Sequence, residues 1–172
     1  MGGSGYDVAC AAVNRPLVYR RNALSPIIQQ VDFRPPFADQ LYFVYLGNKQ
    51  NSREGINKYR SVEKSRASAI TAVNRLTHRF IQAQTLQELE DVIREHEALI
   101  GDFFEMECVK SRLFPDFWGE VKSLGAWGGD FILVSSSRDT AETEAYFVQK
   151  GFDKPIRFQD MIASDSTQNV LP

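Results

Sequence analysis

Two glycine-rich stretches hold the residues of this chain whose types and spacing could do chemistry. The first, residues 125–130 (Gly-Ala-Trp-Gly-Gly-Asp), places three glycines in five positions directly before an apolar run. Glycine reaches positive φ angles and leaves backbone N–H groups uncovered, as a phosphate-binding loop requires. The candidate phosphate-binding residues are Gly125, Ala126, Gly128 and Gly129. A tight turn from a helix into a strand would explain the same glycines without a ligand, because an isolated glycine motif is a weak signal.

The second stretch, residues 2–11, combines a glycine loop with an aspartate at the start of a helix-compatible segment. Gly3, Ser4 and Gly5 are candidates for contact with a nucleotide or phosphate, and Asp7 follows them. Phosphoryl transfer needs positioning, charge neutralisation and a carboxylate that orients or deprotonates the acceptor hydroxyl. Asp7 fits this role, although on residue type alone an aspartate at this place is more often only the N-cap of the following helix. A phosphate loop normally follows a strand, so we expect a part of the protein upstream of this stretch.

Four polar side chains near these stretches are further candidates for contact with phosphate or substrate. They are Lys49, Ser52, Arg53 and Lys122. Each of these residue types is more often a solvated charge or a helix cap. His78 and His96 lie far apart on different predicted helices, so they do not predict a metal site.

The composition predicts one globular core and narrows the partners. Of the 172 residues, 43% are hydrophobic and 12% aromatic, enough for one good core. A net charge of −2 offers no general attraction to nucleic acid or to an anionic membrane, so neither is an expected partner. No apolar run approaches the ~20 residues that span a bilayer. Cys10 and Cys108 are too few for a disulfide scaffold or a zinc site, so we expect a cytoplasmic protein with reduced thiols.

The periodicity of apolar residues predicts the elements that position the two stretches. The first region, residues 1–36, ends at Pro35-Pro36, where neither a helix nor a strand continues easily. Its predicted elements are a helix over residues 7–13 and strands over residues 17–19 and 27–33. The second region covers residues 37–172. Its predicted elements are a strand over residues 41–46, a helical region from Ser52 toward Gln84, a helix over residues 86–104, a helix from Pro115 through Val121, a strand over residues 131–134, a helix from Asp139 or Thr140 to Val148 and a short strand over residues 155–158.

Two of these elements have strong local signals. Residues 41–46 are apolar or aromatic without alternation, as expected for a strand covered on both faces. Thr85 and Glu88 fit a capping box at the start of the helix over residues 86–104. The element order predicts an α+β fold, with a long helix pair on one face of a small, mostly antiparallel sheet. The glycine loop at 125–130 is expected to join a helix to a strand.

The residues of both stretches resemble motifs of the GHMP kinases, a superfamily of small-molecule kinases named for galactokinase, homoserine kinase, mevalonate kinase and phosphomevalonate kinase. Residues 4–9 (Ser-Gly-Tyr-Asp-Val-Ala) resemble the segment Ser-Gly-x-Asp-x-Ala, which carries the catalytic aspartate of the mevalonate and phosphomevalonate branches. Residues 5–9 also resemble the signature Gly-Tyr-Asp-Ile-Ala of a bacterial subgroup. Residues 125–129 resemble the third motif, a glycine loop of the C-terminal domain that helps to close the phosphate site. The resemblance spans nearly the whole chain.

This resemblance implies an ATP-dependent kinase for a small-molecule alcohol or phosphate acceptor of the mevalonate or phosphomevalonate type, in the isoprenoid pathway. It implies that Asp7 is the catalytic carboxylate and that Mg²⁺ accompanies ATP. Residues 1–36 would be a remnant of the N-terminal domain, and residues 37–172 a ferredoxin-like C-terminal domain. The family's main ATP loop, with its Gly-Ser-Ser segment, and the Mg²⁺ ligands belong upstream of Asp7. We therefore expect these 172 residues to bind ATP weakly or not at all.

Two residues depart from the family pattern. Trp127 stands where glycine or another small residue is usual, and Asp130 where a small or apolar residue is common. The alternative interpretation is a non-catalytic α+β binding or dimerisation module that keeps the family glycines for folding. The two short strands before residue 36 lack sheet partners, so we expect apolar edges that favour association, including a homodimer.

Overall fold

The computed structural model describes residues 5–13, 15–22, 25–47, 59, 62, 66–125 and 129–162. The chain divides into two compact units, one of Met1–Arg34 with Ile162–Pro172 and one of Pro35–Met161. The assignment of these units to kinase domains stays a prediction. None of the helices in the described part of the chain is long and apolar enough to cross a lipid bilayer.

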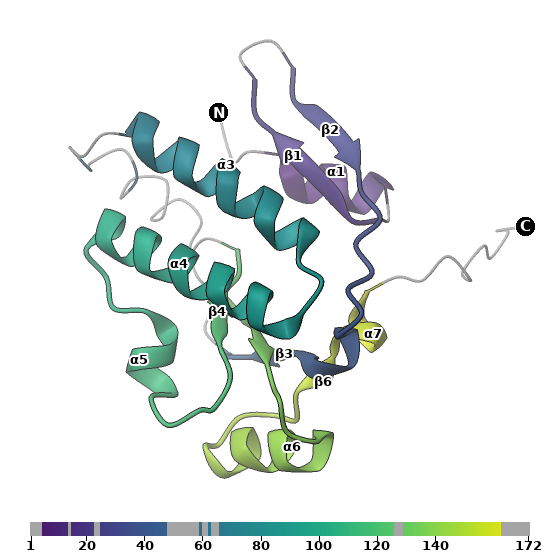
Figure 1. Ribbon diagram of the computed structural model, residues 1–172, viewed down its shortest axis with the longest axis vertical. Helices are drawn as coiled ribbons and strands as arrows, with labels where there is room; N and C mark the ends of the chain where they lie inside the picture. Colours follow the sequence, from purple (N-terminus) through teal and green to yellow (C-terminus); the bar gives the residue numbers. More distant parts are fainter. Residues whose placement is uncertain are drawn as a thin grey trace, which may run out of the picture. The chain divides into compact units, whose positions relative to one another are not determined.

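The described part of the first unit contains one helix and one hairpin, drawn in purple in Figure 1. Helix α1 covers Tyr6–Val13, and strands β1 (Leu17–Arg20) and β2 (Ile27–Gln30) pair in antiparallel register. Ala9 is the one buried residue among those described in this unit, and all four residues of β2 are exposed. The predicted helix and strands are thus present, and among their described residues only Ala9 is buried.

The second unit is built on a four-stranded antiparallel sheet with strand order β4-β5-β3-β6. Its strands are β3 (Leu41–Tyr45), β4 (Val121–Ser123), β5 (Phe131–Ser135) and β6 (Ile156–Arg157). The central pair runs in the register Leu41↔Ser135 to Tyr45↔Phe131. Both central strands are largely buried, as the apolar runs at residues 41–46 and 131–134 predict.

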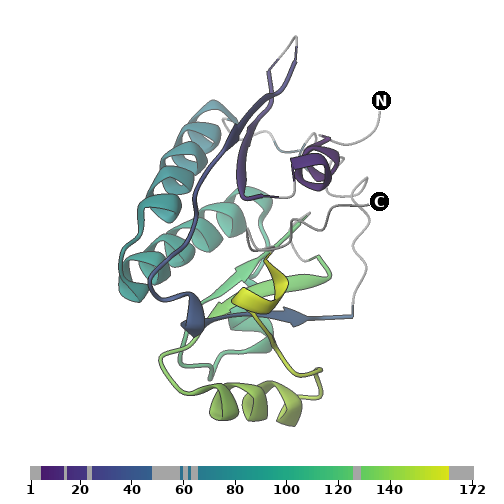
Figure 2. The same ribbon diagram turned by 90° about the vertical axis from the view of Figure 1, so that its right-hand side faces the viewer.

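Helices cover both faces of this sheet, which gives the three layers visible in Figure 2. The helical elements are the short 3-10 helix η1 (Ala38–Gln40), α3 (Arg66–Gln82), α4 (Leu86–Phe104), α5 (Val109–Leu113), α6 (Thr140–Gln149) and α7 (Phe158–Met161). Helix α4 begins with the predicted capping box, in which Thr85 and Glu88 satisfy each other's backbone N–H groups. Helix α3 packs beside α4 and is held there in part by Arg79, whose Nη1 lies 2.6 Å from Glu95 Oε2. The α+β fold with a long helix pair on one face is confirmed.

The opposite face of the sheet carries a cluster of aromatic side chains. Inward residues of the strands, among them Val44 and Val134, meet Phe114, Phe117 and Phe147. The ring centroids are 5.2 Å apart in the pair Phe114–Phe147 and 5.1 Å apart in the pair Phe117–Phe147. Such contacts bury large apolar areas and add about 0.5–1.5 kcal/mol per aromatic pair beyond area burial.

The predicted helix from Pro115 through Val121 is wrong. Helix α5 ends at Leu113, a turn follows in which Phe117 N donates to Phe114 O, and Val121 belongs to the edge strand β4. The cause is tertiary: Gly119 lies so close to β5 that an added Cβ would meet Ser135 O at 1.8 Å. The helical region predicted from Ser52 is described from Arg66 onward, and most of residues 52–65 lie outside the described residues.

Polar contacts hold this turn against α6. Asp116 Oδ1 accepts hydrogen bonds from Tyr146 Oη at 2.6 Å and Lys150 Nζ at 2.8 Å. The Lys150 and Tyr146 bonds lower the pKa of Asp116 to about 2. Trp118 Nε1 donates to Ser136 Oγ at 2.9 Å, which anchors the far end of the turn. The side chains whose spacing suggested a helix are therefore fixed by contacts with other elements.

We predict that Gly119→Ala destabilises the protein by more than about 3 kcal/mol, because the new methyl group would collide with the backbone of β5. Gly151→Ala is the control, since Gly151 has open space around it and a φ of 87°. It should cost only about 1–2 kcal/mol, from backbone strain alone. Urea unfolding of both variants checks the difference, and equal losses would contradict the close approach of Gly119 to β5.

Candidate functional site

The glycine loop joins β4 to β5, so the prediction that it joins a helix to a strand is wrong. Leu124, Gly129 and Phe131 form the neck of the loop, where its two ends meet. There Leu124 N donates a hydrogen bond to Phe131 O at 3.3 Å. Gly125 has a φ of 67°, a conformation that other L-residues adopt only with strain. Gly129 is glycine for a different reason, because a Cβ there would lie 2.7 Å from Leu124 O. One glycine thus permits the turn of the backbone and the other permits the two ends of the loop to meet.

Asp130 follows the loop and carries a buried oxygen. Its Oδ1 is enclosed and has no hydrogen-bond partner in the described part of the chain, while its backbone O accepts from Leu46 N at 2.7 Å. An uncompensated buried polar atom costs about 1–3 kcal/mol. In the sequence Asp130 is notable only as a departure from the family motif. The structure shows that it places a buried polar atom beside the loop.

A buried polar cluster lies at the end of β4 that leads into the loop. Its centre is Glu97 of α4, which is 4% exposed. Glu97 Oε2 accepts a hydrogen bond from Ser123 Oγ at 2.8 Å, and Glu97 Oε1 lies 3.4 Å from His96 Nδ1 and 4.0 Å from Lys122 Nζ. Lys122 Nζ also donates to Ser123 O at 3.3 Å. The cluster thus binds both the side chain and the backbone of the last β4 residue.

Lys122 is the one candidate substrate contact that the structure describes, and its side chain is only 19% exposed. Its ammonium group lies near Glu97 and 3.5 Å from His96 Nδ1. Burial lowers the pKa of Lys122, and the carboxylate of Glu97 opposes that shift. These contacts make Lys122 an internal partner of Glu97 rather than a solvated charge.

The signal for Glu97 was present in the sequence but ambiguous. Glu97 continues the series of buried α4 positions Leu89, Ile93 and Gly101 at a spacing of four residues. A charged residue at such a position needs a partner. Its partners, Lys122 and Ser123, lie 25 and 26 residues further along the chain, and no local pattern identifies them.

The first unit carries Gly5 and Asp7. Gly5 has a φ of 82°, and its backbone O accepts from Ala9 N at 3.1 Å as the first hydrogen bond of α1. Asp7 is the second residue of α1 and is exposed. The position directly before the helix belongs to Gly5, and Asp7 lies in the first turn, where the helix dipole favours a negative charge. The candidates Gly3, Ser4, Lys49, Ser52, Arg53, Ala126 and Gly128 lie outside the described residues.

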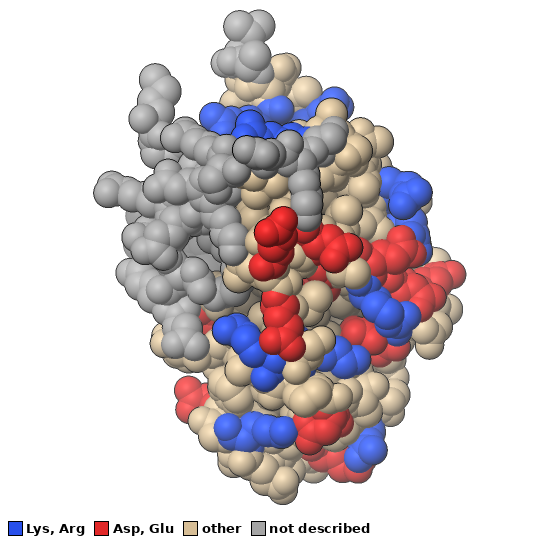
Figure 3. Space-filling model, turned by 90° about the vertical axis from the view of Figure 1, so that its left-hand side faces the viewer, with Lys and Arg blue, Asp and Glu red and all other residues tan. Residues whose placement is uncertain are grey.

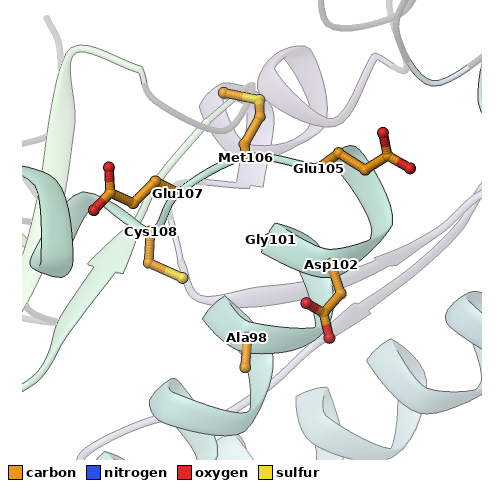
Figure 4. A pocket seen from close by; sticks show the side chains of 7 residues that line it. All are labelled: Ala98, Gly101, Asp102, Glu105, Met106, Glu107 and Cys108. Atoms are coloured by element: carbon orange, nitrogen blue, oxygen red, sulfur yellow. The ribbon is translucent and has the colours of Figure 1, made fainter.

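A separate hollow of about 600 Å³ lies at the C-terminal end of α4, around the left-handed residue Glu105 (Figure 4). Its lining residues are Ala98, Gly101, Asp102, Glu105, Met106, Glu107 and Cys108. Three carboxylates make this hollow a poor place for a phosphate. Burial and the charges of Glu97 and Asp102 raise the pKa of the Cys108 thiol, so it is a weak nucleophile.

The described residues offer no group of three or more His, Cys, Asp or Glu side chains that could hold a metal ion. Charged side chains of both signs are interspersed on the face drawn in Figure 3.

Comparisons with known proteins show a similarity of fold to two solved structures. No protein-family model matches the sequence. No curated protein matches it. The structure is similar to that of the Lin0012 protein from Listeria innocua, with a TM-score of 0.57 and 17% identity over 76% of this chain and 41% of that one. It is also similar to mevalonate kinase from L. major, solved in complex with R-mevalonate, with a TM-score of 0.60 and 14% identity over 87% of this chain and 48% of that one.

The chain has a GHMP-like fold. Mevalonate kinase belongs to that superfamily, and the α+β architecture agrees with the C-terminal part of a GHMP kinase. The chain spans less than half the length of either neighbour. Identities of 14% and 17% show the fold alone and assign no residue a role.

We predict that Gly129→Ala opens the neck of the glycine loop and destabilises the protein by about 1–3 kcal/mol, because a methyl group cannot fit beside Leu124 O. Gly125→Ala, at a position with open space, should cost about 1–2 kcal/mol through its positive φ and leave the neck bond intact. Amide hydrogen exchange at Leu124 distinguishes the two variants. Equal exchange rates at Leu124 would show that Gly129 does not close the neck.

Proposed function

We propose that this chain is the C-terminal part of a GHMP-type, ATP-dependent kinase. Its acceptor is a small-molecule alcohol or phosphate of the mevalonate or phosphomevalonate type. The observation that carries the proposal is the glycine loop between β4 and β5, in which Gly125 has a positive φ and Gly129 closes the neck, within a GHMP-like fold. R-mevalonate is the ligand of the neighbouring kinase structure, and its relevance to this chain is part of the proposal.

The loop's role in this proposal is to bind phosphate through backbone N–H groups. Gly125 is exposed, and apart from Gly125 itself and its two chain neighbours no heavy atom lies within 4 Å of the place where a Cβ would stand, so a ligand can approach its backbone closely. Amide donors hold phosphate oxygens without the side-chain entropy loss of a lysine. Lys122, directed toward Glu97 and His96, supports the strand below the loop.

Asp7 is proposed as the carboxylate that orients or deprotonates the acceptor hydroxyl. Its exposure and its place in the first turn of α1 leave the side chain accessible to a substrate. ATP supplies the phosphoryl group, and Mg²⁺ would neutralise its phosphate charges. No step of the proposal depends on a metal ligand in this chain.

We predict that Asp7→Asn lowers turnover by about 10² to 10⁴-fold in the full gene product that contains these residues, because the amide lacks the carboxylate's basicity. Stability should change little, since asparagine keeps the size of the side chain. The Michaelis constant for ATP should also change little, because ATP binding does not use this carboxylate. A coupled ADP-release assay with a panel of isoprenoid-pathway alcohols and sugars measures both constants.

Asp32→Asn is the matched control, because Asp32 is an exposed aspartate of the same unit whose ion pair with Arg34 lies on the surface. It should leave turnover within about twofold of wild type, since exposed ion pairs contribute little. If Asp7→Asn kept more than about a third of wild-type turnover, Asp7 would not be the catalytic carboxylate. If the wild-type product showed no ATP-dependent transfer to any acceptor, a non-catalytic binding or dimerisation module would be the better explanation.

A further inference from the structure

Helix α4 presents two glutamates to the sheet, and each accepts a hydrogen bond from a serine of a strand. Glu90 Oε1 accepts from Ser135 Oγ at 2.7 Å, and Glu97 Oε2 accepts from Ser123 Oγ at 2.8 Å. The two glutamates are seven residues apart, which is about two helical turns and places them on the same side of α4. Together they attach α4 to the ends of two different strands.

The two pairs lie at opposite ends of the sheet. Ser135 is the last residue of β5 and pairs with Leu41 at the start of β3. Ser123 is the last residue of β4, pairs with Ile132 near the start of β5, and stands two residues before Gly125. The Glu97 pair is therefore next to the glycine loop, and the Glu90 pair is at the end of the sheet away from it.

The two pairs also differ in their surroundings. Glu90 is half-buried, and its serine also accepts a hydrogen bond from Glu120 N at 2.8 Å. Glu97 is enclosed with Lys122 and His96, and Lys122 holds the backbone O of Ser123. Burying charged groups costs stability unless their partners are well placed, so apolar residues are the default at such core positions. A polar cluster at this place gives directional contacts with the end of β4 that a leucine could not give.

These contacts bear directly on the neck of the loop. Ser123 is followed by Leu124, whose N–H bonds to Phe131 O and whose O limits the residue at position 129 to glycine. We propose that Glu97 is a positioning residue for the glycine loop: through Ser123 and Lys122 it fixes the end of β4, and so sets the place of Gly125 and Gly129. The ligand of the loop rests on the proposed function, whereas the positioning itself does not.

The test compares Glu97→Gln with Glu90→Gln by amide hydrogen exchange of the 172-residue chain. Glutamine keeps an oxygen that can accept the serine hydroxyl but removes the charge, which leaves Lys122 without its carboxylate. We expect Glu97→Gln to speed exchange at Leu124 about tenfold and to leave Ser135 unchanged. Glu90→Gln should instead speed exchange at Ser135 and leave Leu124 unchanged, because Ser135 N donates a hydrogen bond to Glu120 O beside the Glu90 pair. Equal effects of both variants at Leu124, or no effect of Glu97→Gln there, would overturn the proposal.

A second pair of variants covers the case in which Glu97→Gln fails to fold. Ser123→Ala and Ser135→Ala remove one hydroxyl each and keep both glutamates. Ser123→Ala should speed exchange at Leu124 more than Ser135→Ala does, and the opposite order would again contradict the role of Glu97.

The kinase assay of the full gene product separates this inference from the proposed function. If the proposed function holds, Glu97→Gln should raise the Michaelis constant for ATP several-fold more than it lowers turnover, and Glu90→Gln should change neither. If the wild type transfers no phosphate, the proposed function fails, and the exchange contrast at Leu124 and Ser135 still decides whether Glu97 positions the loop. If the wild type is active and Glu97→Gln has the same Michaelis constant for ATP, Glu97 does not act on the phosphate site.

Discussion

The pairing of β5 with strands on both of its edges is the constraint on which the rest of the second unit depends. Residues Phe131–Ser135 form an antiparallel ladder with β3 on one side and with β4 on the other. One face of β5 meets the phenylalanine cluster, and Ser135 on the other face bonds to α4. Because β5 begins directly after the glycine loop, every contact that fixes β5 also fixes one end of that loop, and the cluster around Glu97 fixes the other end.

Local sequence patterns were enough to predict an element where the residues of that element themselves indicate its burial or its first turn. The unbroken apolar run at residues 41–46 and the Thr85–Glu88 capping box each identify an element that the structure contains. The spacing of Phe117, Trp118 and Val121 imitates a helix, but these residues lie in a turn and a three-residue strand. Their conformation follows from the approach of Gly119 to Ser135 O, a contact with a strand that comes later in the chain. A pattern of apolar residues carries no information about such an approach.

The same limit applies to the candidate site. Glycine density identified the loop, but the reasons for its glycines, a positive φ at Gly125 and the nearness of Leu124 O at Gly129, depend on how β4 and β5 meet. The Glu97–Ser123 bond joins residues 26 positions apart, so only the packing of α4 on the sheet reveals it. Asp7 remains a prediction from residue type and family resemblance. The unit that contains Asp7 differs in its burial from the unit that contains the loop, because Ala9 is the one buried residue among those described in the Asp7 unit.

The proposed phosphate loop thus belongs to a unit with a large buried core, and the proposed catalytic carboxylate to a unit whose described residues include one buried side chain. Native-state hydrogen exchange of the 172-residue chain at increasing denaturant tests this difference most directly. Amides of β3 and β5 should exchange only through global unfolding, whereas amides of β1 and β2 should exchange through an opening of much lower free energy, because a two-stranded hairpin without a core is marginally stable. Equal free energies of exchange for the hairpin and for β3 and β5 in a monomer would contradict this difference between the two units.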